Sequence, residues 1–320
     1  MTQPAPLPAP TGAAIGDAVD ALRSARAAWR QRQSPARAAA SFPSRGAIER
    51  IVLLLAGALY PRRLGEQRVA PAEEDRLVAA KLAAAFTELE REIGHELGYW
   101  QAEAQTAFAP DQAATIVRLF AASLGDIRRL IDSDVDAAFL GDPAAQSTDE
   151  ILVCYPGAIA SLHHRIAHPL YTLGAPIVAR LISELANERT GIDIHPGATI
   201  GERFFIDHGT GVVIGETAVV GDGVRLYQHV TLGARSPLGA ARHGPRDRYA
   251  RHPVIGDDVV IYAGATILGR VTIGRGATIG GNVWLLRDVP PGGVVVQPEA
   301  TLLAPAAGHA LRDTLVAAEA

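Results

Sequence analysis

Three pairs of neighbouring acidic, basic and imidazole side chains stand out in the second half of the 320-residue sequence. A carboxylate next to an imidazole fixes the tautomer of the ring and raises its basicity, which suits removal of a proton from a hydroxyl group. Such a pair can also be a surface salt bridge with only a structural role. The residue types therefore indicate general-base chemistry as one of two interpretations. The pairs are Asp193 with His195, Asp207 with His208, and Arg251 with His252.

The three pairs lie in or beside a six-residue repeat of aliphatic residues. A helix needs apolar residues at a period of 3.6 and a flat strand at a period of two, and six fits neither over this length. It fits short strands joined by tight corners and stacked in coils, with one aliphatic side chain per hexad pointing inward. The sequence therefore predicts a left-handed parallel β-helix of hexapeptide repeats rather than a glycine-rich β-sandwich. The repeat positions are Ile194, Ile200, Ile206, Ile214, Val220, Leu226, Leu232, Ile255, Ile261, Ile267, Ile273, Ile279 and Leu285.

The predicted coil length decides which polar residues meet. Three hexads give a coil of about eighteen residues, so position 193 is expected almost beneath position 211 in the next layer. His208 would then lie near Asp193, one coil away at the same edge of the prism. The sequence thus predicts that the imidazole of His208 and the carboxylate of Asp193 come together.

The repeat is interrupted once, by a loop that we place at residues 234–253. Loops of this length are usually functional or disordered. Its guanidinium groups suit recognition of an anionic ligand. A solvated loop whose charges keep it soluble is the simpler interpretation for most of them. The five arginines are Arg235, Arg242, Arg246, Arg248 and Arg251.

Ahead of the repeat, the apolar residues follow a helical period. We expect an α-helical domain at residues 46–190 and the β-helix at residues 191–297, which makes the fold class α+β. Residues 1–45 are rich in Ala, Pro and Arg and are expected to form a disordered tail. Residues 298–320 form a second tail. The expected helices cover Ile51–Leu59, Leu77–Leu97, Asp111–Leu124, Asp126–Leu140, Pro156–Leu173 and Pro176–Arg189.

The composition excludes several classes of protein. A hydrophobic fraction of 48%, a charged fraction of 20% and a net charge of −4 are those of a soluble globular chain without a nucleic-acid or membrane partner. The single cysteine, Cys154, fits a reducing cytoplasm, and the longest apolar run, residues 51–60, is too short to span a bilayer. His164 and His168 have a spacing that suits a metal, but Cys and carboxylate partners are absent nearby in the sequence. We therefore predict surface or helix-packing histidines, no metal, and a cytoplasmic protein.

Longer motifs surround the three pairs: Asp193-Ile-His-Pro196, Asp207-His-Gly-Thr-Gly211, Gln228 through Gly233, Arg251-His-Pro253 and Ala263-Gly-Ala-Thr-Ile-Leu-Gly269, preceded by Asp142-Pro143 and Tyr155-Pro-Gly157. Together they resemble the motifs of serine O-acetyltransferases, a family of the hexapeptide-repeat acyltransferase superfamily. The resemblance covers roughly residues 140–297, about half of the chain. The hexads alone indicate only an acyltransferase-type β-helix. The first two motifs together indicate serine as the acceptor.

The resemblance implies an enzyme that transfers the acetyl group of acetyl-CoA to the hydroxyl of L-serine, giving O-acetyl-L-serine for cysteine biosynthesis. It implies His208 as the general base and Asp193 as its orienting partner. Acetyl-CoA would lie in a groove between neighbouring β-helices and be held largely by backbone groups. The residues implied for serine are Asp142 and Asp207 at the ammonium group and Arg251 and His252 at the carboxylate. Those implied for acetyl-CoA are Gly233, Ala234, Ala263, Thr278 and Gly281.

The resemblance also implies a homotrimer and leaves open whether two trimers pair. Members that dock into O-acetylserine sulfhydrylase end in Ile, whereas this sequence ends in Ala318-Glu-Ala, so docking is not expected. Three alternatives remain: a γ-class carbonic anhydrase with zinc on three coil histidines, a hexapeptide acetyltransferase for homoserine or a sugar, and a scaffold that only binds a partner. Feedback inhibition by cysteine and the role of residues 1–45 are not decided by the sequence.

Overall fold

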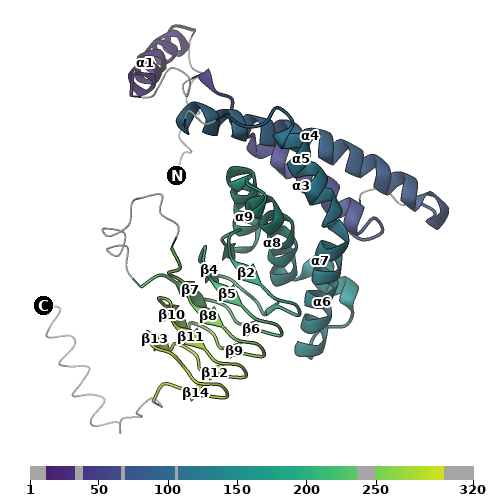
Figure 1. The fold of residues 1–320 in the computed structure, drawn as a ribbon, viewed down its shortest axis with the longest axis vertical. Coiled ribbons are helices and arrows are strands. Elements are labelled where there is room, and N and C mark those ends of the chain that lie inside the picture. Colours follow the sequence, from purple (N-terminus) through teal and green to yellow (C-terminus); the bar gives the residue numbers. More distant parts are fainter. Residues whose placement is uncertain (1–11, 33–38, 66–68, 105–106, 236–248, 299–320) are drawn as a thin grey trace, which may run out of the picture.

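Short parallel strands form a left-handed β-helix of three sheets (Figure 1). The computed structural model describes residues 12–32, 39–65, 69–104, 107–235 and 249–298. Within them the strands are β1 (Asp193–Ile194), β2 (Thr199–Ile200), β3 (Phe205–Ile206), β4 (Val213–Ile214), β5 (Val219–Val220), β6 (Arg225–Leu226), β7 (Thr231–Gly233), β8 (Val254–Ile255), β9 (Val260–Ile261), β10 (Thr266–Leu268), β11 (Thr272–Ile273), β12 (Thr278–Ile279), β13 (Trp284–Leu285) and β14 (Val294–Val295). Sheet A has the order β1-β4-β7-β10-β13, sheet B β2-β5-β8-β11, and sheet C β3-β6-β9-β12-β14.

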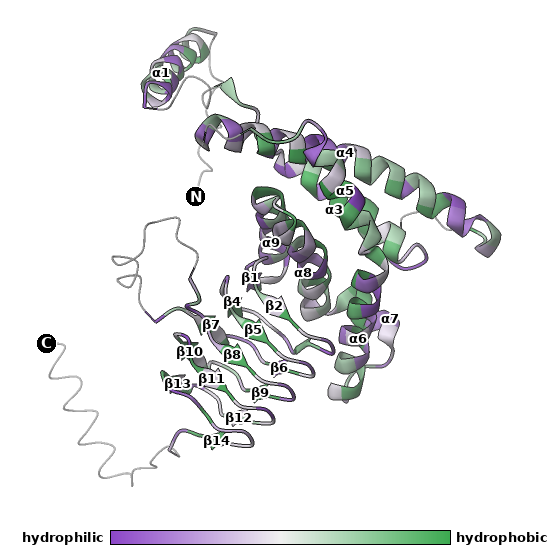
Figure 2. Ribbon diagram, viewed as in Figure 1, coloured by the Kyte–Doolittle hydropathy of each residue, from purple (hydrophilic) through white to green (hydrophobic). Residues whose placement is uncertain are grey.

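The inward positions are those of the hexads, which confirms the predicted fold class. In sheet A, Ile194, Ile214 and Leu232 occupy equivalent positions on neighbouring strands, and each is at most 4% exposed. Figure 2 shows the same concentration of hydrophobic residues along β5 and β8 in sheet B. Burial of each aliphatic side chain contributes about 1.5–3 kcal/mol relative to exposure. The stack of inward aliphatics is therefore the main stabilising feature of the coils.

The first coil is two residues longer than the sequence predicts. Asp193 pairs with Val213, twenty residues on, whereas Val213 pairs with Thr231, eighteen residues on. The prediction that position 193 lies beneath position 211 is therefore wrong. The extra residues lie in the corner between β3 and β4, where His208 has a φ of 60°. Such a left-handed conformation is uncommon for a residue with a Cβ atom.

Helices precede the β-helix and pack around a hydrophobic core of their own. The sequence predicts α5, α6, α8 and α9 to within two residues at each end, but it begins α3 six residues late, ends α4 seven residues early and misses α7. The start of α7 does have a local sequence signal, a serine followed by a glutamate three residues later, as in a capping box. The side chain of Ser147 accepts a hydrogen bond of 3.1 Å from the backbone N–H of Glu150. The helices are α1 (Gly12–Arg30), α3 (Arg45–Leu59), α4 (Glu74–Ala104), α5 (Gln112–Ala122), α6 (Leu124–Gly141), α7 (Thr148–Cys154), α8 (Pro156–Thr172) and α9 (Pro176–Thr190), with the 3-10 helix η1 (Pro71–Glu73).

Helix α1 corrects the prediction that residues 1–45 are disordered throughout. Residues 12–30 are helical although none of them is buried. Alanine, the strongest helix former, recurs along α1, so local propensity accounts for a helix that burial does not. Residues 1–11, most of the predicted loop (236–248) and most of the predicted C-terminal tail (299–320) lie outside the described residues. Among the helices that the structure describes, none has the length and apolar character needed to cross a membrane.

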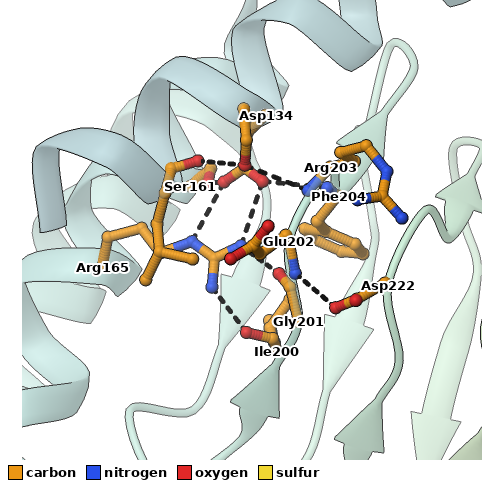
Figure 3. A network of polar contacts seen from close by, with 11 residues as sticks. Asp134, Ser161, Arg165, Ile200, Gly201, Glu202, Arg203, Phe204 and Asp222 are labelled. Atoms are coloured by element: carbon orange, nitrogen blue, oxygen red, sulfur yellow. Dashed lines mark hydrogen bonds and ion pairs between the residues drawn. The ribbon is translucent and has the colours of Figure 1, made fainter. Parts of the chain in front are cut away.

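A buried ion pair joins the helices to the first coil (Figure 3). Asp134 on α6 and Arg165 on α8 form two hydrogen bonds of 3.0 Å, and their side chains are only 3% and 4% exposed. Arg165 also donates to the carbonyl oxygens of Ile200 and Gly201 at 2.6 and 2.5 Å. The backbone N–H of Phe204 donates to Asp134 at 2.9 Å. The pair therefore fixes α6 and α8 against the corner that leads into β3.

Removal of one partner of this pair should destabilise the protein. Asp134→Asn leaves the guanidinium of Arg165 buried beside a neutral amide, and such a loss costs about 3–5 kcal/mol. We expect this decrease in the free energy of unfolding measured in urea. The matched control is Arg275→Gln, which breaks the ion pair between Arg275 and Asp257. Because the side chain of Arg275 is 68% exposed, this variant should lower the free energy of unfolding by less than about 1 kcal/mol. Equal losses in both variants would contradict the structural role assigned to the buried pair.

Candidate active site

The widened corner between β3 and β4 carries the predicted base, His208. Its side chain is 74% exposed, and its Nε2 atom lies 3.9 Å from Oδ1 of Asp207. The other carboxylate oxygen of Asp207 accepts a hydrogen bond of 2.7 Å from Nη2 of Arg225 on β6. An exposed imidazole close to a carboxylate is accessible to a small substrate, as proton transfer requires.

Helix α6 brings Asp142 to the same corner. One oxygen of Asp142 accepts a hydrogen bond from the backbone N–H of Ala144 at 2.8 Å, and the other accepts one from the hydroxyl of Tyr155 at 2.6 Å. The bond from Tyr155 is the main cause that lowers the pKa of Asp142, and it raises the pKa of Tyr155 to about 12. The carboxylate of Asp142 is therefore ionised at neutral pH. We call Asp142, Tyr155, Asp207, His208 and Arg225 the acidic corner.

A second group lies where the chain passes from sheet A to sheet B. Arg251 donates a hydrogen bond of 2.6 Å to Oε2 of Glu216, and the hydroxyl of Tyr171 on α8 donates one of 2.7 Å to Oε1. Burial acts to raise the pKa of Glu216, but these hydrogen bonds outweigh it and the pKa is lowered. The ionised carboxylate therefore holds Arg251 in place. We call Tyr171, Glu216, Thr217, Arg251 and His252 the arginine corner.

His252 is a neutral imidazole within the arginine corner. Burial, followed by the charge of Arg251, lowers the pKa of His252 to about 4. The backbone N–H of Thr217 donates to Nδ1 of the ring at 3.1 Å, so the ring proton is assigned to Nε2. A Cβ atom at Gly215 would lie 2.1 Å from the ring. Glycine is therefore required there, and the ring presents one N–H donor.

The two corners lie at opposite ends of sheet A. The acidic corner precedes β4 and the arginine corner follows it, with residues 209–215 between His208 and Glu216. At the rise of an extended strand these residues span on the order of 20 Å. The hydrogen bonds and ion pairs described for Asp207, His208 and Arg225 stay within the acidic corner or reach the end of α6. A single chain thus holds the predicted serine residues as two separate groups.

Asp193 does not pair with His208, which corrects the contact predicted from the coil length. Its Oδ1 atom lies 3.6 Å from Nη2 of Arg180 on α9. Burial raises the pKa of Asp193, and Arg180 partly offsets this effect. Because the first coil is twenty residues long, Asp193 stacks on Val213 rather than on the corner. The chain enters β1 directly from α9, so no earlier strand of sheet C lies below His208.

The residues predicted to bind acetyl-CoA divide over the same two ends of sheet A. Gly233 ends β7 and Ala234 follows it, on the side of the arginine corner. Ala263 and Gly281 precede β10 and β13, on the side of the acidic corner, and Thr278 lies on β12. A Cβ atom at Gly281 would lie 3.2 Å from the carbonyl oxygen of Ala263. These small residues leave backbone groups as the main contacts that the positions can offer.

Two of the histidines on α8 have positions typical of helix packing. His163 and His164 are buried in α8, and Nδ1 of His163 lies 2.7 Å from the carbonyl oxygen of Ile159. Over the described ranges, no group of three or more His, Cys, Asp or Glu side chains is placed to hold a metal ion.

Tyr171, Glu216 and Arg225 contribute to the site although sequence reasoning did not single them out. Arg225 lies eighteen residues after Asp207, but the coil there is twenty residues long, so Arg225 pairs with Phe205 rather than with Asp207 and the hexad period gives no signal for the contact. Glu216 lies within the repeat just after the Asp207 motif. Tyr171 has no comparable signal, because its contact with Glu216 joins a helix to a coil.

Two histidines whose pKa is lowered in the folded protein should make stability depend on pH. Burial is the main cause that lowers the pKa of both His195 and His252 from 6.5 to about 4. Between these values the unfolded chain binds protons that the folded chain excludes, so the free energy of unfolding falls as the pH decreases from 6.5 to 4. We expect His252→Asn to flatten this slope when thermal unfolding is followed against pH. His208→Asn, at an exposed site, is the control and should keep it; two equal slopes would contradict the assignment.

Comparisons with known proteins agree with this arrangement. A family model described as bacterial transferase hexapeptide (six repeats) matches residues 252–287. The plasmid-encoded serine acetyltransferase of Synechococcus elongatus is 51% identical over 267 residues, which cover 81% of this chain and 82% of that protein. The serine acetyltransferase of Bacillus licheniformis is 48% identical over 177 residues, which cover 53% of this chain and 78% of that protein.

Solved structures give the same result. Serine acetyltransferase isoform 3 of Entamoeba histolytica, in complex with cysteine, is 31% identical with a TM-score of 0.67, covering 91% of this chain and 96% of that one. The Neisseria gonorrhoeae serine acetyltransferase in complex with serine is 30% identical with a TM-score of 0.51, covering 80% of this chain and 96% of that one. Because half of the residues are shared with the Synechococcus relative over four fifths of both chains, the chain belongs to the serine acetyltransferase family.

Proposed function

We propose that this protein is a serine O-acetyltransferase, which transfers the acetyl group of acetyl-CoA to the hydroxyl of L-serine and releases O-acetyl-L-serine and CoA. The observation that carries the proposal is the composition of the two corners. One offers carboxylates and an exposed imidazole, and the other offers a guanidinium and a neutral imidazole. The ammonium, hydroxyl and carboxylate groups of an amino acid need these kinds of partner. The serine complex of the Neisseria relative supports the same acceptor.

The binding roles follow from charge. The carboxylates of Asp142 and Asp207 suit the ammonium group of serine. The guanidinium of Arg251 and the Nε2–H donor of His252 suit its carboxylate, because hydrogen bonds with an ionised partner are the stronger ones. Held at both ends, serine would present its hydroxyl to the exposed ring of His208.

The chemical step needs one base and no covalent enzyme intermediate. A neutral ring nitrogen of His208 accepts the hydroxyl proton while the serine oxygen bonds to the thioester carbonyl carbon. The tetrahedral intermediate then breaks its carbon–sulfur bond, and the imidazolium returns the proton to the departing thiolate. The negative charge on the carbonyl oxygen requires donors, and the backbone N–H groups beside Gly233 and Gly281 are the candidates that the acetyl-CoA positions offer.

Two carboxylates compete for the role of orienting the His208 ring. Asp207 lies 3.9 Å from the ring in this structure. Asp193 pairs with Arg180 instead, so it reaches the ring only if the exposed side chain of His208 turns toward β1. An Asp193→Asn variant with unchanged kcat would assign the role to Asp207 alone.

The separation of the two corners supports sites shared between copies of the chain. Serine is far shorter than the distance of roughly 20 Å set by the residues between the corners, so one chain cannot hold both ends of it. In a ring of identical copies, the acidic corner of one copy can face the arginine corner of the next. The acetyl-CoA positions divide in the same way. We therefore propose a homotrimer, with pairing of two trimers through the helices as an extension of the same resemblance.

The proposed location is the cytoplasm, where cysteine biosynthesis would use the product. The support is chemical: Cys154 is exposed and free, which fits a reducing compartment. Secretion of the folded protein with Cys154 in an intermolecular disulfide would contradict it.

Release of free thiol from acetyl-CoA tests the function directly. Across L-serine, L-homoserine and a panel of sugars, we expect the highest kcat/KM with L-serine. His208→Ala should lower kcat by ~10²–10⁴-fold, the usual contribution of a general base, with a much smaller change in KM. A preference for another acceptor would replace serine in the proposal, and unchanged turnover in the variant would remove His208 from the mechanism.

Mixing of two inactive variants tests whether the sites are shared. His208→Ala damages the acidic corner and Arg251→Ala the arginine corner, so each alone should have little activity. After refolding together in equal amounts, about a quarter of the shared sites of a ring would combine two intact corners. We expect activity to recover toward that fraction. Activity that stays at the sum of the separate variants would place the whole site within one chain.

A further inference from the structure

Arg225 occupies an unusual position in the acidic corner. It lies on β6, one coil after its partner Phe205 in the register of sheet C. Its Nη1 atom donates a hydrogen bond of 2.8 Å to the carbonyl oxygen of Gly141, and its Nη2 atom donates one of 2.7 Å to Oδ2 of Asp207. The guanidinium also lies 4.9 and 4.7 Å from the ring centroids of Phe205 and Tyr227. One side chain thus contacts both the last residue of α6 and the residue that follows β3.

These two contacts are made beside the carboxylates assigned to the ammonium group. Gly141 immediately precedes Asp142, and Asp207 is bound directly. Space at Gly141 is tight, since a Cβ atom there would lie 3.1 Å from the ring of Phe205 and 3.6 Å from Nη1 of Arg225. The position of the guanidinium therefore largely sets the distance between the end of α6 and the residue that follows β3.

Charge gives Arg225 a second effect. Two ionised carboxylates that share a site repel each other, and one of them tends to take up a proton. The guanidinium offsets one of the two negative charges. Asp142, Asp207 and Arg225 together then carry a net charge of −1, which matches one ammonium group. Because it binds Oδ2 of Asp207, it also leaves Oδ1 directed toward His208.

A purely stabilising role explains these contacts less well. The Nε atom of Arg225 is buried and has no hydrogen-bond partner among the described residues, and an unpaired buried donor is unfavourable for folding. A second arginine, Arg275, pairs with Asp257 across the same interval of eighteen residues. That pair is more exposed and lies away from both corners, so it provides a matched control.

We propose that Arg225 is a positioning residue that sets the spacing and the net charge of Asp142 and Asp207 for the amino group of the acceptor. The inference rests on the proposed function, because it concerns how the acceptor of that reaction is bound. Arg225 itself does not contact the reacting atoms.

Steady-state kinetics of Arg225→Gln, Arg225→Lys and Arg275→Gln test this role in the full-length protein. Arg225→Gln should raise KM for L-serine by about tenfold or more, as small displacements of binding groups do, with kcat changed less and KM for acetyl-CoA unchanged. Arg225→Lys retains the charge but not both hydrogen bonds, so it should recover only part of the loss. Arg275→Gln should behave as the wild type.

Thermal unfolding of each variant separates this role from a structural one. An unchanged KM for serine in Arg225→Gln would overturn the inference. A loss spread over both substrates together with a lower unfolding temperature would also overturn it, in favour of a structural role. If the wild-type protein did not acetylate serine, that result would contradict the proposed function itself, independently of the results for the Arg225 variants.

Discussion

Parallel stacking of the coils requires the buried aliphatic residue of each strand to lie in register with that of the neighbouring strand. This constraint fixes the position of every corner. In sheet C the buried residues Ile206, Leu226 and Ile261 align in one row. The residue after each of them turns out of the sheet at the same edge, so Asp207, Tyr227 and Tyr262 follow one another in a column. The rings of Tyr227 and Tyr262 are stacked with centroids 5.1 Å apart. Core packing therefore decides which side chains share a surface, although none of the core residues takes part in chemistry.

The coil departs from its period at the corner that carries the base. Two extra residues lie between Ile206 and Ile214, in the corner where His208 has its left-handed backbone conformation. A regular eighteen-residue coil would leave less chain for this corner. Departures from a repeat are expected at functional sites, where local rules give way to chemistry. The same reasoning applies to the tight packing of the His252 ring against Gly215, where no side chain fits.

The sequence predicts features that depend on local period, and it misses those that depend on distance in space. The hexads specify the inward residues, and the helical period locates most helices. The predicted contact between Asp193 and His208 assumed a uniform coil of eighteen residues. The first coil has two more, and these shift the contacts between the first two coils. Contacts between helix and coil, such as Tyr171 with Glu216, have no sequence period at all. The family motifs pointed to Asp142, Asp207, His208, Arg251 and His252, but only the structure separates them into two groups.

The helices are part of the site rather than an addition to it. Helix α6 is fixed at two points two turns apart: Asp134 binds Arg165 and the backbone of Phe204, and Gly141 binds Arg225. A buried ion pair is a costly way to gain stability, since apolar residues of similar size often serve as well. Its hydrogen bonds have direction, however, and here they fix the axis of α6 against β3. Because Asp142 follows the second point, the position of an ammonium-binding carboxylate depends on both. A β-helix without these helices would retain His208 and Arg251 but would lack Asp142 and the hydroxyl of Tyr171 that supports Glu216.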